Sequence, residues 1–582
     1  MQDILVKNEM KSQDMTGYPS IDKPWLKYYN QNAIDQKLPE HSMFEYIFQN
    51  NQGYSDSIAL EYYGQTITYG AMFSEVEKAA TGLASIGVKQ GDIVSFLAVT
   101  TPEVIFSIYA VNYLGAVCNM LDPRMSDEII SNIISNTNSH YLIILDIFAD
   151  KVSVSTVADH CDIIILPTTK PSSPSPEMEQ PPIAYRHITW ERLLSHIPSG
   201  CITPKAPFSA NRPALIEYTG GTTGEPKGVV LSNENVNAAA FQYARTRIDN
   251  ERGQSWQTVA APFIAYAFIF SMHIPLSLGM ICKIVIYDPK MIAIQTIQNE
   301  YNHIAANPLM WENVIHLPEA QSRDFSHLIA PITGADYMNP KLENEINAFL
   351  KAHGCKWGIC QGYGLTETSA GICFNQGDDC TRIGSVGIPL INTVISIFDS
   401  DTHDELKYGK TGEVCIAGPS VMLGYYNNKA ATDDVIKKHK DGTYWLHTGD
   451  LGHMDNDGFL YFDGRIKRMF VCYNGAKVFP PIIEKVVIQS KLVESCVVVG
   501  KQDPCHAVGQ VPVAFVILQP DCSDSVDTIR DELNILCKNK LPEYECPVEW
   551  NFIDSFPRTA VGKVDYRALE SEMTNDATHM DK

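Results

Sequence analysis

Residues 218–228 read Tyr-Thr-Gly-Gly-Thr-Thr-Gly-Glu-Pro-Lys-Gly and combine glycines, hydroxyls and a lysine in one short stretch. Glycine lets the backbone approach a ligand closely and turn several N–H groups toward one point. Threonine hydroxyls and an ammonium group add contacts that suit a polyphosphate. The stretch is not a Walker P-loop, because Pro226 precedes the lysine and Gly228 stands in place of serine or threonine. An ordinary glycine-rich turn is the alternative, but the hydroxyls together with the lysine favour phosphate binding.

A second glycine-rich stretch, residues 361–368, reads Gln-Gly-Tyr-Gly-Leu-Thr-Glu-Thr. Tyr363, between two glycines, offers a flat aromatic face that a planar base can approach. Thr366 and Glu367 offer oxygen ligands that suit Mg²⁺, the usual companion of nucleoside triphosphates. The stretch therefore favours a nucleotide as the guest.

Three more stretches carry isolated polar groups that could join such a site. Asp450 follows a tight turn at Thr448 and Gly449 and could accept hydrogen bonds from ribose hydroxyls. Residues 464–468 concentrate positive charge, and Lys563 follows a glycine near the carboxyl end. Singly, a turn, a solvated basic cluster and a surface lysine are the simpler explanations.

Composition limits the class of protein. A chain of 582 residues is too long for a single core, so we expect at least two domains. The net charge of −23 argues against a nucleic-acid partner. The 15 cysteines form no Cys-x-x-Cys pair, which favours buried free thiols in a reducing compartment over zinc or disulfide frameworks. No signal peptide is visible at the start of the chain, and we expect a cytoplasmic protein.

The elements that must position these groups alternate between strand and helix. A hairpin around Gly64 precedes a helix over 72–83, a buried strand over 93–99 and a helix that Thr101 caps. This order predicts an α/β fold with a largely parallel sheet. The first forty residues are expected to lie as a surface strap. Residues 253–282 lack Asp, Glu, Lys and Arg, and interruptions favour a buried helix beside a ligand cavity over a membrane span.

Together, in this order and spacing, the five motifs resemble those of the AMP-forming adenylating superfamily, which includes acyl-CoA synthetases, luciferases and nonribosomal-peptide adenylation domains. The resemblance covers roughly residues 40 to 572. It implies a large N-terminal domain of two αβ-type sheets plus a small β-subdomain, followed by a small mobile α+β C-terminal domain. The implied limits are an extension (1–40), an AMP-binding domain (41–464), a mobile domain (465–572) and a frayed tail (573–582).

The resemblance also implies residue roles. Catalysis is assigned to Lys563, Glu367 and Thr223, and Mg²⁺ to Glu367 and Thr223. ATP or AMP is assigned to Thr219, Gly221, Thr222, Thr223, Gly224, Lys227, Gly334, Ala335, Asp336, Tyr363, Gly364, Thr366, Asp450, Arg465 and Lys563. The acid pocket is assigned to Tyr266, Phe270, Tyr337 and Gly362, the hinge to Lys467, and passage of the pantetheine arm to Gly475.

The implied reaction joins a carboxylic acid to the α-phosphate of ATP and then passes the acyl group to the thiol of CoA. The first segment of the pocket has no aspartate for a substrate ammonium, which disfavours α-amino acids and favours an apolar fatty or aryl acid. Three positions depart from the usual pattern. Gly220 replaces a frequent serine, Ala265 replaces a pocket-side histidine, and Val471 replaces a lysine after the hinge.

Two alternatives stay open. A stand-alone enzyme that loads a separate acyl- or peptidyl-carrier protein would carry the same motifs. A non-enzymatic nucleotide-binding scaffold is disfavoured, because Lys563, Glu367 and Asp450 are all present.

Overall fold

The structure is a computed structural model of the chain. It describes residues 15–153, 161–168, 187–195, 197, 203, 205–219, 226–259, 261–285, 291–472, 476–503, 509–520, 522, 524–558, 564–566 and 568–570. Two compact units are present. The first is Met1–Ile395, Ile416–Leu446 and Asn456–Leu460, and the second is Ser396–Cys415, His447–Asp455 and Tyr461–Lys582.

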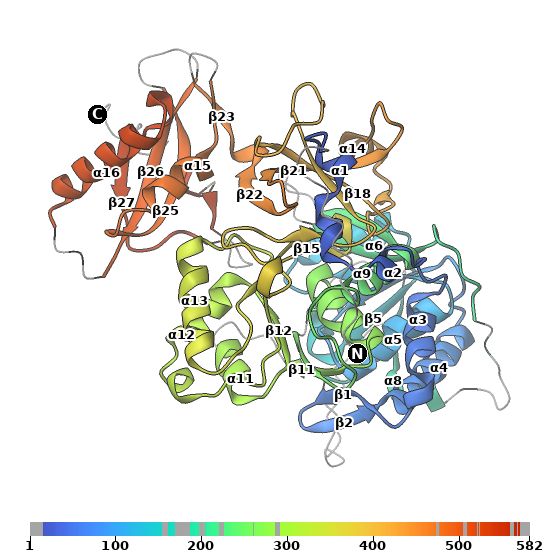
Figure 1. Cartoon of the computed structure of the whole chain (residues 1–582). Helices are drawn as coiled ribbons and strands as arrows, with labels where there is room; N and C mark the ends of the chain where they lie inside the picture. Colours follow the sequence, from blue (N-terminus) through green and yellow to red (C-terminus); the bar gives the residue numbers. More distant parts are fainter. Residues whose placement is uncertain are drawn as a thin grey trace. The chain divides into compact units, whose positions relative to one another are not determined.

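A nine-stranded sheet forms one half of the first unit (Figure 1). Its middle strands, from β14 to β1, are all parallel, while β16, β15 and β2 pair antiparallel at the ends. Across the sheet the strands are β16 (Ile388–Pro389), β15 (Ala370–Phe374), β14 (Cys360–Leu365), β13 (Ala330–Thr333), β12 (His303–Ala306), β10 (Ser255–Val259), β11 (Ile281–Val285), β1 (Ile58–Tyr62) and β2 (Gln65–Thr68).

An eight-stranded sheet forms the other half. Its parallel part consists of β8, β4, β3, β5, β6 and β7. Strand β9 pairs antiparallel with both β8 and β19. Across the sheet the strands are β19 (Gly424–Tyr425), β9 (Lys227–Ser232), β8 (Pro213–Thr219), β4 (Val117–Leu121), β3 (Ile93–Leu97), β5 (Tyr141–Leu145), β6 (Asp162–Leu166) and β7 (His187–Thr189).

The helices of the first unit follow the strands in the alternation that the sequence predicts. Thr101 caps α5 by accepting a hydrogen bond from the Val104 N–H, as expected. The helices are α1 (Pro19–Asp22), α2 (Gln31–Ile34), α3 (Met43–Asn51), α4 (Tyr69–Ser85), α5 (Pro102–Tyr113), α6 (Asp127–Asn136), α7 (Asp150–Ser153), α8 (Trp190–Ser195), α9 (Asn233–Tyr243), α10 (Ile274–Ser277), α11 (Ile292–Gln298), α12 (Pro308–His316), α13 (Pro340–Ala352) and α14 (Lys429–Val435).

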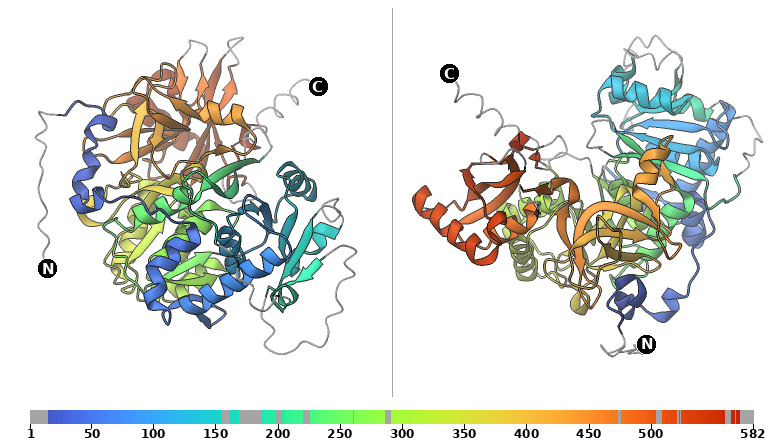
Figure 2. Two further views of the ribbon diagram at one scale, coloured as in Figure 1. Left: turned by 90° about the vertical axis from the view of Figure 1, so that its right-hand side faces the viewer. Right: turned by 90° about the horizontal axis from the view of Figure 1, so that it is seen from above.

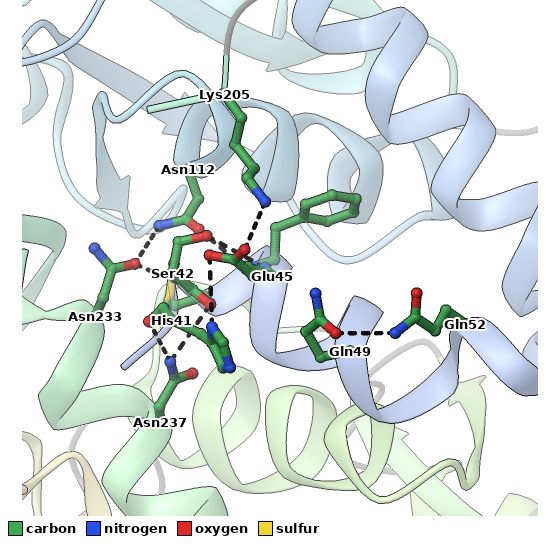
Figure 3. A network of polar contacts seen from close by, with 11 residues as sticks. His41, Ser42, Glu45, Gln49, Gln52, Asn112, Lys205, Asn233 and Asn237 are labelled. Atoms are coloured by element: carbon green, nitrogen blue, oxygen red, sulfur yellow. Dashed lines mark hydrogen bonds and ion pairs between the residues drawn. The ribbon is translucent and has the colours of Figure 1, made fainter. Parts of the chain in front are cut away.

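Asparagine side chains hold helix α3 to α5 and α9 (Figure 3). Oδ1 of Asn233 accepts hydrogen bonds from the Met43 N–H at 3.0 Å and from the Asn112 amide at 2.7 Å. The amide of Asn237 donates to the carbonyl of His41 at 2.8 Å. Because these groups are buried, their hydrogen bonds fix the register of three helices whose apolar faces alone would allow sliding.

Of the predicted surface strap the structure describes residues 15–40, most of which are exposed or half-buried. Trp25 is fully buried, and the Tyr29 hydroxyl donates to the carbonyl of Pro389 at 3.0 Å. Tyr29 also accepts a hydrogen bond from the Gln376 amide at 2.6 Å. Aromatic residues in the segment therefore anchor it in the first unit.

The uncharged stretch 253–282 folds as strand, helix and strand. Between β10 and β11 runs a π-helix, η5 (Tyr266–His273), that continues into α10. The prediction of one buried helix is thus correct only for its middle. Within the described ranges, no helix combines the length and apolar character needed to cross a bilayer.

The second unit contains a three-stranded sheet of β25 (Val493–Gln502), β26 (Gln510–Leu518) and β27 (Glu549–Phe552). Helices α15 (Pro480–Val487) and α16 (Val526–Lys540) share one apolar cluster with β25 and β26, so both cover the same face (Figure 1 and Figure 2). On β25, Val498 joins that cluster, while Val497 and Val499 join a second one, as alternation along a strand requires. The sequence predicted this α+β unit correctly.

A five-stranded sheet contains β17 (Val394–Phe398), β18 (Gly412–Ala417), β21 (Tyr444–Met454) and β20 (Ile436–Lys438) in that order, with β22 (Leu460–Arg465) paired to β21. This sheet is the small β-subdomain that the resemblance implied. The two large sheets, this sheet and the small α+β unit confirm the predicted fold class. The residue limits of the domains stay a prediction.

Candidate active site

The glycine- and hydroxyl-rich stretch lies between two paired strands. Strands β8 and β9 are antiparallel, with Tyr218 opposite Gly228 and Thr219 opposite Lys227. A side chain at position 228 would meet Ile216 at 3.0 Å and the Tyr218 ring at 3.2 Å, so glycine suits this close pairing. The two strand ends place Thr219 beside Lys227. The predicted residues Gly221, Thr222, Thr223 and Gly224 lie outside the described residues.

Three side chains of the first unit meet at the end of this hairpin. The Tyr425 hydroxyl donates to Oε1 of Glu367 at 2.8 Å, and Nζ of Lys227 lies 5.0 Å from the centre of the same ring. Burial raises the pKa of Tyr425, and the neighbouring Glu367 carboxylate raises it further. Tyr425 therefore stays protonated and holds Glu367 in one orientation. Sequence reasoning predicted Glu367 and Lys227 but missed Tyr425.

Tyr425 reaches this position through backbone pairing distant in sequence. In the short strand β19, Gly424 and Tyr425 pair with Val230 and Val229 of β9. The Met422 N–H donates to the Glu367 carbonyl at 2.8 Å, which ties the same segment to the end of β14. Glu367 itself begins to turn the chain in a 3₁₀ helix over Thr366–Thr368.

Glycines bring the backbones of β13 and β14 close to neighbouring groups. A Cβ at Gly334 would lie 3.2 Å from the Gly362 carbonyl oxygen. A Cβ at Gly362 would lie 2.4 Å from the Phe374 ring, and one at Gly364 only 1.8 Å from the Ala370 carbonyl oxygen. A side chain at Gly362 or Gly364 would clash, so these two positions require glycine, and a side chain at Gly334 would crowd the Gly362 carbonyl.

The turn after β13 departs from ordinary backbone geometry. Ala335 has φ +67°, in the left-handed region that non-glycine residues seldom adopt. Asp336 accepts a hydrogen bond from the Tyr337 N–H at 2.9 Å through its own side chain, which stabilises the turn. Ala335, Asp336 and Tyr337 are all exposed, so this turn presents its side chains to solvent next to Gly362. Strain of this kind is concentrated at functional sites.

Tyr266 and Phe270, two of the residues predicted to line an acid pocket, form a stack of three aromatic rings with Phe374. The ring centres of Tyr266 and Phe270 lie 5.3 Å apart at 8°, and those of Phe270 and Phe374 lie 5.2 Å apart at 12°. The Tyr266 ring lies 4.0 Å from where a Cβ at Gly334 would be, which brings the stack to the glycine turn. Phe270 is fully buried and belongs to the core, whereas Tyr337 is exposed to solvent. Sequence reasoning missed Phe374.

The hydroxyl of Tyr266 is buried and makes no hydrogen bond within the described structure. Burial raises its pKa, so it stays protonated. A buried donor without a partner is costly. Ala265, where a histidine was expected, is buried directly before this tyrosine and offers no polar group.

The second unit has its own polar group at Asp450. Arg465 lies with Nε 2.8 Å from Oδ1 of Asp450, in agreement with the predicted partnership. Glu413, which sequence reasoning missed, accepts hydrogen bonds from the Gly449 N–H at 3.0 Å and from His447 Nδ1 at 2.7 Å. Asp450 lies within strand β21 and not after the tight turn that the sequence predicted, although Gly449 before it has φ +70°. The buried Glu413 carboxylate holds this part of the strand. Lys467, the predicted hinge residue, lies in a 3₁₀ helix, Ile466–Arg468, whereas Gly475 and Lys563 lie outside the described residues.

The chain matches a model of the AMP-binding enzyme family over residues 47–426 and one of the AMP-binding enzyme C-terminal domain over residues 482–563. It is 27% identical over 572 residues to a long-chain-fatty-acid–CoA ligase of Bacillus subtilis, covering 95% of this chain and 99% of that one. It is 29% identical over 528 residues to an indoleacetate–CoA ligase of Aromatoleum aromaticum, covering 89% and 96%.

Solved structures share the fold. An anthranilate CoA ligase in complex with anthranoyl-AMP has a TM-score of 0.76 at 21% identity, covering 93% of this chain and 98% of that one. An o-succinylbenzoate CoA synthetase of Bacillus subtilis in complex with its acyl-adenylate intermediate has a TM-score of 0.71 at 23% identity, covering 92% and 99%.

Proposed function

Because the chain belongs to the AMP-binding enzyme family, we propose that it is an ATP-dependent acid:CoA ligase. In the first step a carboxylate oxygen of the substrate attacks the α-phosphorus of ATP, and the bond to the β-phosphate breaks to release pyrophosphate. In the second step a CoA thiolate attacks the acyl carbon, and AMP leaves with the bonding electrons. The single observation that carries the proposal is the Lys227–Tyr425–Glu367 cluster at the end of the β8–β9 hairpin.

The barrier to the first step comes from charge, since an anion approaches a polyanion. Little proton transfer is needed, and catalysis rests on positioning and on neutralising charge. Lys227 provides a cation at the hairpin, and we assign Lys563 to the point where the carboxylate meets the α-phosphate. Glu367 offers Mg²⁺ the oxygen ligand it prefers, and the ion would supply positive charge to the phosphates.

The nucleotide's other contacts divide between two groups of residues. The flat ring of Tyr363 supports stacking of the adenine, and Asp450 supports binding of the ribose hydroxyls. Arg465 neutralises part of the charge on Asp450, which is otherwise fully buried. Each of these roles is part of the proposal.

The acid is proposed to be apolar, either fatty or aryl. The π-helix Tyr266–His273 carries no acidic residue to pair with an ammonium group. The Tyr266–Phe270–Phe374 stack provides an apolar wall beside the turn at Gly334. The fatty and indole substrates named for two relatives are of this kind.

The acceptor is proposed to be free CoA, with a separate carrier protein as the alternative. In either case we propose that the C-terminal domain beginning at residue 465 turns about Lys467 between the two steps, exchanging Lys563 for Gly475 at the site. We place the reaction in the cytoplasm, in keeping with the free cysteines at the thirteen described positions.

The test is a two-stage assay with full-length protein, MgATP and a panel of fatty, aryl and amino acids. Acid-dependent exchange of pyrophosphate into ATP reports the first step, and thioester formation with CoA reports the second. We expect exchange with an apolar acid and consumption of CoA. Absence of exchange with every acid would overturn the enzyme proposal. Exchange without CoA consumption would favour a carrier protein.

A further inference from the structure

Two histidines and a glutamate converge in the second unit, and a cysteine lies beside one of the histidines. Ligand atoms of His403, Glu413 and His447 all lie within 4.8 Å of one another. Cys415 adds a sulfur, with Sγ 3.5 Å from Nδ1 of His447. We propose that His403, Glu413 and His447 bind a divalent transition-metal ion, with Cys415 as an added donor beside His447 and zinc as the ion that fits best.

The strands place the ligands on a rigid frame. Glu413 and Cys415 are two residues apart on β18, so both point to the same face. His447 lies on β21, the neighbouring strand. Sites built on strands hold their ligands more accurately than sites built on loops alone.

His403 completes the set from the turn after β17. Its N–H donates to the Asp399 carbonyl at 2.9 Å, and its φ of +56° is left-handed, so the turn has a defined shape. The ring packs edge to face on His447, with centres 5.1 Å apart at 78°. His403 is exposed whereas Glu413 and His447 are buried, which gives an ion a route from solvent to the inner ligands.

The ligand types and spacings suit zinc. Imidazole nitrogen, carboxylate oxygen and thiolate sulfur are the donors that structural zinc sites use in tetrahedral geometry. Nitrogen and sulfur bound to one tetrahedral zinc lie about 3.5 Å apart, which matches the Cys415–His447 distance. Glu413 Oε2 is closer, 2.7 Å from Nδ1 of His447, at a hydrogen-bonding distance. An ion would displace the shared proton and the thiol proton, as metal binding to such ligands does.

The spacing of these ligands in the sequence does not match a known metal-binding motif. The ligands lie at 403, 413, 415 and 447, without any Cys-x-x-Cys or His-x-x-x-His unit. The cysteine spacing excludes the familiar zinc motifs, but pairing of strands β18 and β21 brings ligands together from distant positions. The site does not depend on the proposed ligase activity.

The test uses full-length protein from which metal has been removed and whose cysteines are kept reduced by a reductant that is not a thiol. Co²⁺ is titrated while visible and near-ultraviolet absorbance is recorded, and Zn²⁺ binding is measured by calorimetry. The informative variant is His403→Ala, because His403 is exposed and its loss should leave the fold intact. The matched control is His316→Ala, an exposed histidine of the first unit with a carboxylate partner, Glu345, at 3.1 Å.

We expect the wild type and His316→Ala to bind one equivalent with equal affinity. We expect His403→Ala to bind at least about tenfold more weakly and Cys415→Ser to lose the thiolate-to-cobalt absorbance. Zn²⁺ should raise the melting temperature of the wild type but not of His403→Ala. Equal affinity in the wild type and His403→Ala, or no binding by the wild type, would overturn the proposal.

Discussion

The hydroxyl of Tyr425 donates a hydrogen bond of 2.8 Å to the carboxylate of Glu367, from a strand that pairs with the far side of the β8–β9 hairpin. Its ring also faces the Lys227 ammonium at 5.0 Å. One tyrosine thus connects the hairpin lysine to the carboxylate proposed to hold Mg²⁺.

Replacing Tyr425 with phenylalanine should slow adenylation while the protein stays folded. A hydrogen bond to a charged group contributes about 1.5–3 kcal/mol, so we expect pyrophosphate exchange to fall at least about tenfold. Tyr444→Phe, an exposed tyrosine, serves as the control. Exchange at the wild-type rate in folded Tyr425→Phe would show that Glu367 needs no such support.

Replacing Lys563 with alanine should separate the two steps. We expect acid-dependent pyrophosphate exchange to fall by several orders of magnitude, because the lysine is proposed to neutralise charge as the carboxylate meets the α-phosphate. Thioester formation from a supplied acyl-adenylate should persist. If both steps fall equally, the proposed exchange of Lys563 for Gly475 is wrong.

Glu343 should make stability depend on pH. Its carboxyl is buried in α13 and accepts hydrogen bonds from the Gln361 amide at 2.7 Å and the Gly384 N–H at 2.8 Å. Burial raises its pKa from 4.5 to about 7, although these hydrogen bonds lower it in part. The folded state therefore prefers the protonated form, and stability present below pH 4.5 is lost as the pH rises through about 7.

Glu343→Gln removes this titration. In urea unfolding from pH 5 to 8, the free energy of unfolding of the variant should rise relative to that of the wild type. The difference should approach about 3 kcal/mol at pH 8. Glu345→Gln, exposed on the same helix, should show no such trend. A difference independent of pH would refute the raised pKa of Glu343.

Phe270→Ala should widen the choice of acid. The ring is the middle member of the stack, so its removal opens space between Tyr266 and Phe374 at a cost of about 3–5 kcal/mol in stability. We expect kcat/KM to shift at least about tenfold toward bulkier acids. Phe268→Ala makes a comparable cavity against Tyr109, on the other side of the helix, and should leave the preference unchanged.

The sequence was informative where local chemistry decides structure. The capping pattern at Thr101 and the hairpin around Gly64 both predicted what the structure contains. Each signal lies within a few residues of the feature it specifies, and backbone sterics or capping provides the cause.

The remaining parts of the site depend on contacts distant in sequence. Tyr425 meets Glu367 across 58 residues, and His447 meets Glu413 across 34. The left-handed Ala335 carries no local signal, since alanine gives no hint of such a backbone. These relationships follow from strand pairing, which a pattern of residue types does not specify.

The aromatic cluster should also allow entry of an acid into the proposed pocket to be followed by tryptophan fluorescence. Trp256 packs edge to face on Phe270 at 5.5 Å and lies flat on the buried imidazole of His303, with centres 4.9 Å apart at 2°. Burial lowers the pKa of His303 to about 3, so at neutral pH the ring carries no charge that would quench the indole. The indole emission should consequently report rearrangement of Phe270 when an acid enters, and stopped-flow fluorescence could time that entry without any label.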